Sequence, residues 1–281
     1  MTASREIQFR NTTLRIGRRT LLMGVLNVTP DSFSGGSVYN DTGLAVEKAE
    51  RMVQEGADIL DIGGESSRPG ALPVPVEEEL ARVLPVLEAV KRANIGIPVS
   101  IDTYKSRVAE QALMKGADII NDITALRGDP AMAGVIAAYS AGVVLMHMKG
   151  NPENMQMDPV YGDIVEELLS YLACSVKTAE KNGICPEKIF IDPGIGFGKT
   201  TEHNLVILRE LRRFTELGKP VLIGTSRKSF IGAITGKPVP ERIFGTAGTV
   251  AASVMNGAFI IRAHDVREMR DVIDIVDAIK K

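Results

Sequence analysis

The stretch EGADILDIG at residues 55–63 decides the fold, because its pattern returns as KGADIINDI at 115–123 and as NGAFIIRAH at 256–264. In each copy a glycine and a small residue precede a short apolar run that ends in polar side chains. The glycine is typical of a helix C-terminus, and the run is typical of a parallel strand buried on both faces. The pattern therefore predicts a chain built by repetition of a βα unit.

Short apolar runs of this kind alternate with amphipathic segments along the chain. The predicted strands are residues 21–28, 59–63, 98–102, 119–122, 143–147, 189–192, 221–224 and 258–262. The predicted helices are residues 44–55, 77–92, 105–115, 131–140, 164–182, 204–213, 241–256 and 266–279. Several of them end at a glycine, such as Gly56, Gly116 and Gly183, which fits a left-handed C-cap. Eight strands that alternate with helices predict an α/β fold, the (β/α)₈ TIM barrel.

The remaining organisation is simple. Residues 7–17, IQFRNTTLRIG, alternate in polarity and predict a β-hairpin outside the barrel. No linker rich in proline, serine or charge divides the chain, so we expect one domain over residues 1–281. A length of 281 residues suits a barrel, which typically has about 250 residues, and a hydrophobic content of 44% supports a large core.

Composition argues against several classes of partner. The net charge of −2 and the absence of tryptophan argue against nucleic acid, which needs a basic surface and stacking platforms. Two cysteines form no disulfide framework, and no Cys and His cluster has the spacing of a zinc site. The first residues lack an apolar signal core, and the apolar runs are too short or too broken to span a bilayer. We expect a cytoplasmic protein that binds neither nucleic acid nor membrane.

One segment offers a competing interpretation. Residues 189–200 read IFIDPGIGFGKT and end in Gly-Lys-Thr, as a nucleotide-binding phosphate loop does. That loop needs a glycine where this chain has Pro193, and proline has no N–H to offer a phosphate. An acid at Asp192 would also repel phosphate. A phosphate-loop kinase is therefore disfavoured. The segment stands out instead for Asp192, an acid at the end of an otherwise apolar run.

Polar side chains recur at one strand end after another, where TIM barrels place their chemistry. In chain order they are Asn27, residues 65–68, Asp102, Asn121, Asp122, Met146, His147, Asp192, residues 226–228, Arg262 and His264. Acids and amides can pair with the donor and acceptor edge of a flat heterocycle. Arg68, Lys228, Arg262 and His264 can hold an anion such as a diphosphate. Together, these polar side chains at the strand ends predict a heterocyclic substrate with a phosphorylated arm.

Several of these residues have a purely structural interpretation as well. Asp102 and Asp192 also fit helix N-caps, and Asn121 fits a bond to a neighbouring loop. His147 and Met146 fit core positions, although a methionine sulfur also packs against a flat ring. Two further assignments are structural: Arg227 is expected to be an ion-pair partner, and His203 a surface or capping residue. Asp265 follows His264 and is expected to hold its tautomer.

The same motifs resemble the dihydropteroate synthase family over nearly the whole chain. They are GVLNVTPDSFS at 24–34, DIGGESSRPG at 61–70, NDI at 121–123, LMHM at 145–148, DPGIGFGK at 192–199, SRKSFIG at 226–232 and IIRAHDV at 260–266. The resemblance implies a folate-pathway transferase on a TIM barrel, which is a sulfonamide target, uses Mg²⁺ and forms a homodimer. Its substrates would be 4-aminobenzoate and (7,8-dihydropterin-6-yl)methyl diphosphate.

The resemblance also implies a role for particular residues. Asp102, Asn121, Asp192 and Lys228 would hold the pterin, with Met146 beside it. Ser67, Arg68, Arg262 and His264 would grip the diphosphate, with Asn27 near the Mg²⁺. Phe33, Pro69, Phe197 and Ser229 would frame the aminobenzoate. Lys228, Arg262 and His264 are the expected catalytic residues.

Two departures from the family pattern stand out. Ser34 is followed by Gly35-Gly36-Ser37, where the family often has Asp-Gly-Gly, so a loop carboxylate is missing. Ser67 stands where the family often has threonine, which keeps the hydroxyl and loses a methyl group. Two rival functions stay open on these motifs: a pterin-binding methyltransferase of the corrinoid type, and a barrel that binds pterin without turnover.

Overall fold

Eight parallel strands form a barrel, as predicted. The structure, a computed structural model, describes residues 5–10, 12–17, 19–29 and 42–281. Hydrogen bonds join the strands in the order β8-β7-β6-β5-β4-β3-β10-β9, and a bridge between Ile191 and Val221 joins the two ends of that order. The strands are β3 (Leu21–Asn27), β4 (Ile59–Gly63), β5 (Val99–Asp102), β6 (Ile119–Asp122), β7 (Gly142–Met146), β8 (Ile189–Asp192), β9 (Leu222–Ile223) and β10 (Ile260–Ala263).

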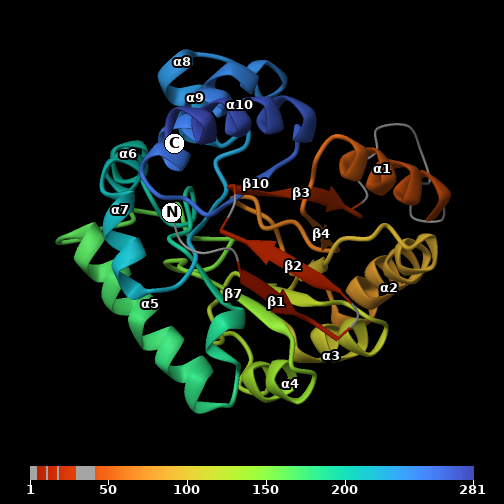
Figure 1. The fold of residues 1–281 in the computed structure, drawn as a ribbon. Helices are drawn as coiled ribbons and strands as arrows, with labels where there is room; N and C mark the ends of the chain where they lie inside the picture. The colour runs from red at the N-terminus through yellow and green to blue at the C-terminus, as the bar shows by residue number, and fades with distance from the viewer. Residues whose placement is uncertain (1–4, 11, 18, 30–41) are drawn as a thin grey trace.

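Helices surround this barrel (Figure 1). They are α1 (Thr42–Gln54), α2 (Val76–Ala93), α3 (Ser106–Met114), α4 (Met132–Ala138), α5 (Ile164–Lys181), α6 (Thr201–Arg209), α7 (Leu211–Phe214), α8 (Ser229–Thr235), α9 (Ile243–Met255) and α10 (Val266–Ile279). Short 3₁₀ turns are η3 (Pro186–Lys188), η4 (Thr215–Leu217) and η5 (Val239–Glu241). The predicted C-cap glycines are confirmed, since Gly56, Gly116 and Gly183 have φ angles of 100°, 97° and 88°.

The elements differ from the predicted ones at a few places. The expected helix 204–213 is two helices, because the chain departs from helical geometry at Glu210, which ends α6 and precedes α7. The short helix α8 was not expected: its seven residues, SFIGAIT, include a glycine and three β-branched residues, which favour a helix weakly. Strand β9 keeps only two of the four expected residues.

The predicted hairpin is β1 (Arg5–Gln8) and β2 (Thr13–Ile16), paired antiparallel. Figure 1 shows it lying across one end of the barrel. Its apolar side chains Ile7, Phe9, Leu14 and Ile16 are buried in one cluster with side chains from inside the barrel, such as Phe190. The hairpin therefore closes the end of the barrel at which the strands begin.

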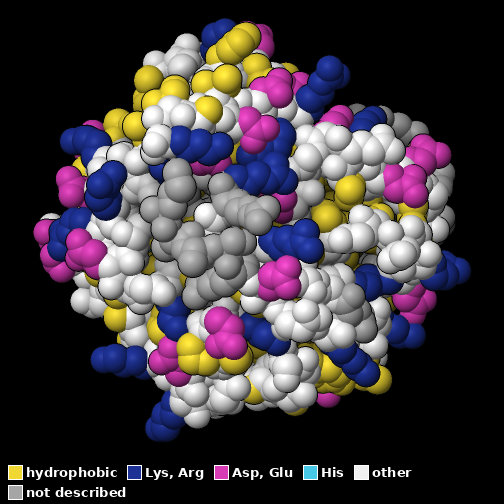
Figure 2. Space-filling model, viewed as in Figure 1, with side chains coloured by type: hydrophobic (Ala, Val, Ile, Leu, Met, Phe, Trp, Pro, Cys, Tyr) yellow, Lys and Arg dark blue, Asp and Glu magenta, His cyan; other side chains and the backbone are white. Residues whose placement is uncertain are grey.

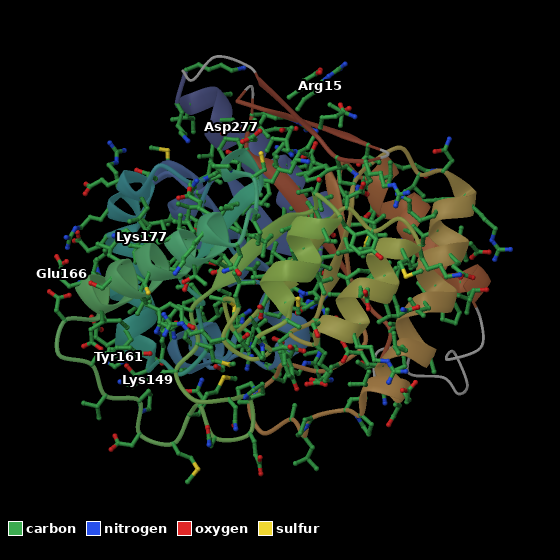
Figure 3. The ribbon with its side chains drawn as sticks, turned by 90° about the horizontal axis from the view of Figure 1, so that it is seen from below. Arg15, Lys149, Tyr161, Glu166, Lys177 and Asp277 are labelled. Atoms are coloured by element: carbon green, nitrogen blue, oxygen red, sulfur yellow. The ribbon has the colours of Figure 1, made fainter. Side chains whose placement is uncertain are left out.

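The other end carries the loops that follow the strands. Figure 3 shows Arg15 of the hairpin on one side of the molecule and Lys149 and Tyr161, which follow β7, on the opposite side. A second and larger apolar cluster lies between the barrel and the helices. Within the described residues, no helix combines the length and the apolarity needed to cross a membrane.

Candidate active site

The polar strand ends meet in one cavity. Strand register places Asp102 of β5 beside Asn121 of β6, and Met146 of β7 beside Asp192 of β8. Nine of the predicted site residues line the same cavity of about 40 Å³: Ser67, Asp102, Asn121, Met146, Asp192, Phe197, Lys228, Arg262 and His264. A larger cavity of about 490 Å³ adjoins it, since Ile123 lines both. The predicted convergence is therefore present in the structure.

Arg262 lines this cavity and bonds two acids, one of which, Asp102, also lines it. Its Nε donates to Asp61 Oδ2 at 2.7 Å, and one terminal nitrogen donates to Asp102 Oδ2 at 2.8 Å. Asp61 also accepts from Asn121 Nδ2 at 3.2 Å, which leaves the Oδ1 of Asn121 as the acceptor for a ligand. Asn121 thus bonds a barrel side chain rather than the neighbouring loop expected in its structural interpretation.

Asp61 is a site residue that the sequence analysis missed. Its side chain is completely buried, and its Oδ1 has no hydrogen-bond partner among the described residues. The available signal was an acid in the middle of the apolar strand ILDIG, where a charge must find a partner. The acid orients both Arg262 and Asn121.

Burial perturbs the two acids that line the cavity. It raises the pKa of Asp102 to about 7, although the charge of Arg262 opposes this shift. It raises the pKa of Asp192 to about 6, against a backbone N–H of Gly194 that donates to Oδ1 at 2.7 Å. Neither acid caps a helix, because the N-cap positions of α3 and α6 belong to Lys105 and Thr200. Ionisation of these two buried acids is costly in the ligand-free site. A ligand with hydrogen-bond donors would stabilise their carboxylates, so the site suits such a ligand.

Lys228 lies between the polar cavity and its aromatic wall. Its Nζ is 3.9 Å from the centroid of the Phe197 ring, a cation–π contact. Burial lowers the pKa of Lys228 to about 8, while the charge of Asp192 opposes the shift. Lys228 is also the N-cap residue of α8, so the start of this unexpected helix positions it.

His264 differs from expectation in two respects. Burial and the charge of Arg262 lower its pKa to about 3, so the imidazole is neutral and is not one of the cations of the site at neutral pH. Asp265 does not hold its tautomer either: it accepts from Arg227 Nε at 3.0 Å. The partner of His264 Nδ1 is Ser226 Oγ at 3.0 Å. The assignment of Arg227 to a structural ion pair is confirmed.

The other predicted residues lie around the cavity. Asn27 and Asp102 both approach Gly63, where an added Cβ would lie 3.5 Å from Asn27 Oδ1 and 3.5 Å from Asp102 Cβ. Arg68 is exposed and does not line the 40 Å³ cavity, although its charge contributes to the lowered pKa of His264. Pro69 is exposed, and Ser229 begins α8. Phe33 and the departure at 35–37 lie outside the described residues.

The Gly-Lys-Thr segment after β8 is structural, and a phosphate has no place in it. Lys199 is buried; its Nζ lies 2.9 Å from Phe197 O and 3.0 Å from Nδ1 of His147, itself a buried residue. Thr200 and His203 form a capping box at the start of α6, which confirms the capping assignment of His203. The phosphate-loop interpretation is therefore excluded by the position of its own lysine.

Comparison with known proteins places this geometry in a family. Residues 23–264 match the family model described as "Pterin binding enzyme". The chain belongs to the pterin binding enzyme family. The chain is 46% identical over 264 residues to the dihydropteroate synthase of Synechocystis, a match that covers 94% of this chain and 91% of that protein.

Solved structures of the family share the whole fold. The dihydropteroate synthase of Yersinia pestis, in a complex with a sulfonamide drug, is 39% identical with a TM-score of 0.93, covering 98% of this chain and 99% of that one. The Xanthomonas albilineans enzyme with 4-aminobenzoic acid is 41% identical with a TM-score of 0.92, covering 99% of each chain. The family resemblance of the motifs is thus confirmed over the full length of the barrel.

Proposed function

We propose that this chain is a dihydropteroate synthase, a transferase of folate biosynthesis built as one pterin-binding barrel domain. It would join 4-aminobenzoate to (7,8-dihydropterin-6-yl)methyl diphosphate and release 7,8-dihydropteroate and diphosphate. The observation that carries the proposal is one cavity that combines buried acids and an amide with Lys228 and Arg262. Relatives of that name matched over nearly their whole length support it.

The pterin would bind at the polar strand ends. Asp102 and Asp192 offer acceptors for the N–H groups of the ring, Asn121 offers Oδ1, and Lys228 offers a donor. Burial raises the pKa of both acids because their ionised forms are poorly solvated. Hydrogen bonds from the N–H groups of a bound pterin would stabilise these ionised forms. Met146 and Phe197, which belong to one apolar cluster, would flank the ring plane.

The diphosphate would bind between Arg262, His264 and the loop that carries Ser67 and Arg68. Neutral His264 would donate from Nε2, with Ser226 holding Nδ1. Among the described residues, no group of three or more His, Cys, Asp and Glu side chains could hold a metal ion. The amide oxygen of Asn27 suits Mg²⁺, which usually binds one or two protein oxygens together with substrate phosphates and water. Bound there, Mg²⁺ would neutralise the developing charge of the diphosphate.

The chemistry would be a displacement at the methylene carbon of the pterin arm. The amine nitrogen of 4-aminobenzoate forms the new C–N bond, the C–O bond breaks, and diphosphate leaves with the electron pair. Arg262, Lys228 and Arg68 stabilise this anion as its charge grows. The nitrogen then loses a proton to water. During the attack, the aminobenzoate would be framed by Phe33, Pro69, Phe197 and Ser229.

The Mg²⁺ assignment is tested by removing the metal: full turnover in excess chelator would contradict it.

The experiment that tests the function is incubation of the purified protein with the pterin diphosphate and 4-aminobenzoate. We expect dihydropteroate, detected by its mass, and one diphosphate for each product molecule. Methyl transfer from methyltetrahydrofolate without diphosphate release would instead support the methyltransferase. Tight pterin binding with no product would support a barrel without turnover.

We also infer a cytoplasmic homodimer. Large hydrophobic side chains are exposed on α8, η5, α9 and α10: Ile234, Val239, Phe244, Met255, Ile275 and Ile279. Figure 2 shows hydrophobic side chains gathered over α8 and α9. Exposed apolar side chains gathered in this way favour association with a second copy.

A further inference from the structure

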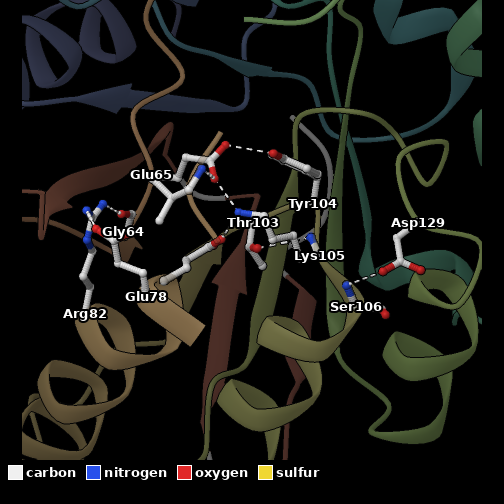
Figure 4. Close-up of polar contacts among 11 residues, drawn as sticks. Gly64, Glu65, Glu78, Arg82, Thr103, Tyr104, Lys105, Ser106 and Asp129 are labelled. Carbon is white, nitrogen blue, oxygen red and sulfur yellow. Dashed lines mark hydrogen bonds and ion pairs between the residues drawn. The ribbon is translucent and has the colours of Figure 1, made fainter. Parts of the chain in front are cut away.

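Two largely buried acids, Glu65 and Glu79, form a cluster with Lys105 beside the larger cavity, which Glu65 lines. Figure 4 shows Glu65 and Lys105 of this cluster. The ammonium group of Lys105 contacts Glu65 Oε2 and Glu79 Oε2. The side chains of Lys105, Glu65 and Glu79 are only 13%, 10% and 1% exposed. Burial raises the pKa of Glu79, and its bond to Lys105 opposes the shift. One lysine thus serves two largely buried acids, and no other ion pair joins either acid to a cation within the described residues.

Glu65 joins this cluster to two parts of the site. Its Oε1 accepts from the Tyr104 hydroxyl at 2.9 Å, and its Oε2 accepts from the backbone N–H of Val74 at 2.9 Å. Tyr104 and Lys105 follow Asp102 almost directly, whereas Glu65 and Val74 are the two ends of the loop that carries Ser67 and Arg68. The cluster therefore ties that loop to the strand end that carries Asp102.

The middle of the loop is exposed and is held by backbone hydrogen bonds, whereas charged side chains hold its ends. Arg68, Pro69 and Gly70 are exposed, and a backbone bond from Gly70 to Pro152 O at 2.8 Å fixes its outer edge. At the inner end, Arg82 donates to Gly64 O at 2.7 Å. Glu65 is therefore the side-chain anchor nearest to Ser67 and Arg68, and Lys105 is its charge partner.

We propose that Lys105 is a positioning residue that holds the loop of Ser67 and Arg68 in place for the diphosphate. This inference rests on the proposed function, because it assumes that the loop grips the departing anion. Lys105 lines neither of the two cavities, so it would act through Glu65. Its loss should weaken binding of the diphosphate and not of the pterin ring.

The test compares ligands with and without the diphosphate. For Lys105→Met we expect binding of the pterin diphosphate, and of inorganic diphosphate with Mg²⁺, to weaken at least about tenfold in calorimetry. Binding of 6-hydroxymethylpterin, which lacks the diphosphate, should change less than about twofold. The KM for the pterin diphosphate should rise more than the KM for 4-aminobenzoate, and Lys105→Arg should restore part of it.

Two further variants keep the test decisive if Lys105→Met folds poorly. Tyr104→Phe removes only the hydroxyl that donates to Glu65 and should weaken the same two ligands about threefold. Lys91→Met removes the ion partner of buried Asp118, whose carboxylate accepts from Thr12 near the hairpin end, and should lower the melting temperature without changing diphosphate binding.

The proposal is overturned if Lys105→Met and Tyr104→Phe bind diphosphate as the wild type does, or if they lose all three ligands equally. Its failure is distinguishable from failure of the proposed function. A wild-type protein that makes no dihydropteroate would contradict the function, whereas an active wild type with unaltered variants would contradict only the role of Lys105.

Discussion

Arg262 carries an energetic role besides its proposed catalytic one, because it neutralises a completely buried acid. Arg262→Ala would leave Asp61 without its cation, and removing one partner of a buried pair costs about 3–5 kcal/mol. We therefore expect lower stability together with a loss of turnover of about 100-fold or more. Urea unfolding and the release of diphosphate measure the two effects separately.

The double variant Asp61→Asn/Arg262→Ala separates these roles. Neutralising Asp61 removes the buried charge, so most of the lost stability should return. Turnover should not return, because the guanidinium proposed to stabilise the leaving anion is still absent. Recovery of activity along with stability would show that Arg262 acts only through the fold.

The pKa of Asp102 makes the ligand-free protein sensitive to pH. Burial raises this pKa from 3.8 to about 7, so the folded state retains a proton that the unfolded chain has lost between about pH 4 and pH 7. Stability should therefore fall as the pH rises through this window, by more than about 1 kcal/mol. Asp102→Asn should lack this component, which unfolding curves at pH 5 and pH 7.5 can measure. Equal pH dependence in both proteins would refute the shift.

At the scale of elements, the loop after β8 depends on close backbone contact with the loop after β7. Gly194 has a φ angle of +71°, and a Cβ built on it would lie 1.9 Å from His147 O. This loop carries Phe197 and Lys199, so its path sets the aromatic wall of the cavity. The glycines of the segment that resembles a phosphate loop, such as Gly194 and Gly198, therefore allow the two loops to pack closely.

Gly194→Ala should therefore disturb both stability and the site. We expect a loss of more than about 3 kcal/mol, because a left-handed alanine alone costs about 1 kcal/mol and here meets a backbone oxygen as well. Gly236→Ala is the matched control, since Gly236 has the same φ angle of +71° with no atom within 4 Å of an added Cβ. Similar losses in the two variants would show that strain, and not the contact, matters.

At the scale of the molecule, the two ends of the barrel have different tasks. The hairpin covers the N-terminal end with apolar side chains, whereas the predicted site residues gather at the other end. The exposed apolar side chains of α8, α9 and α10 lie on helices that surround the barrel and are proposed for the homodimer. Assembly through them would leave the mouth of each barrel to its own substrates.

Phe244→Asp tests this surface, because Phe244 is 82% exposed on α9. Light scattering after size exclusion should show a dimer for the wild type and a monomer for the variant, since a buried carboxylate opposes the interface. Met157→Asp is the control, an exposed apolar residue on the β7–α5 loop. A variant at Phe244 that remains dimeric would place the interface elsewhere.

The sequence alone predicted most of the fold and most members of the candidate site, although it missed Asp61. Buried strands, amphipathic helices and glycine caps are local patterns, so the order of elements could be read from them. Once the barrel was inferred, its geometry placed Asp102, Asn121, Asp192 and Arg262 at one end. The short α8 escaped prediction because its local preference for a helix is weak.

Only the tertiary structure decided which of these side chains pair and how they titrate. Arg262 and Asp61 are 201 residues apart in the chain, and no local pattern reports that contact. The neutral state of His264 and the raised pKa values of Asp102 and Asp192 likewise depend on burial by distant segments. Local preferences determine which elements form, whereas solvation and charge at a site depend on every segment that packs around it.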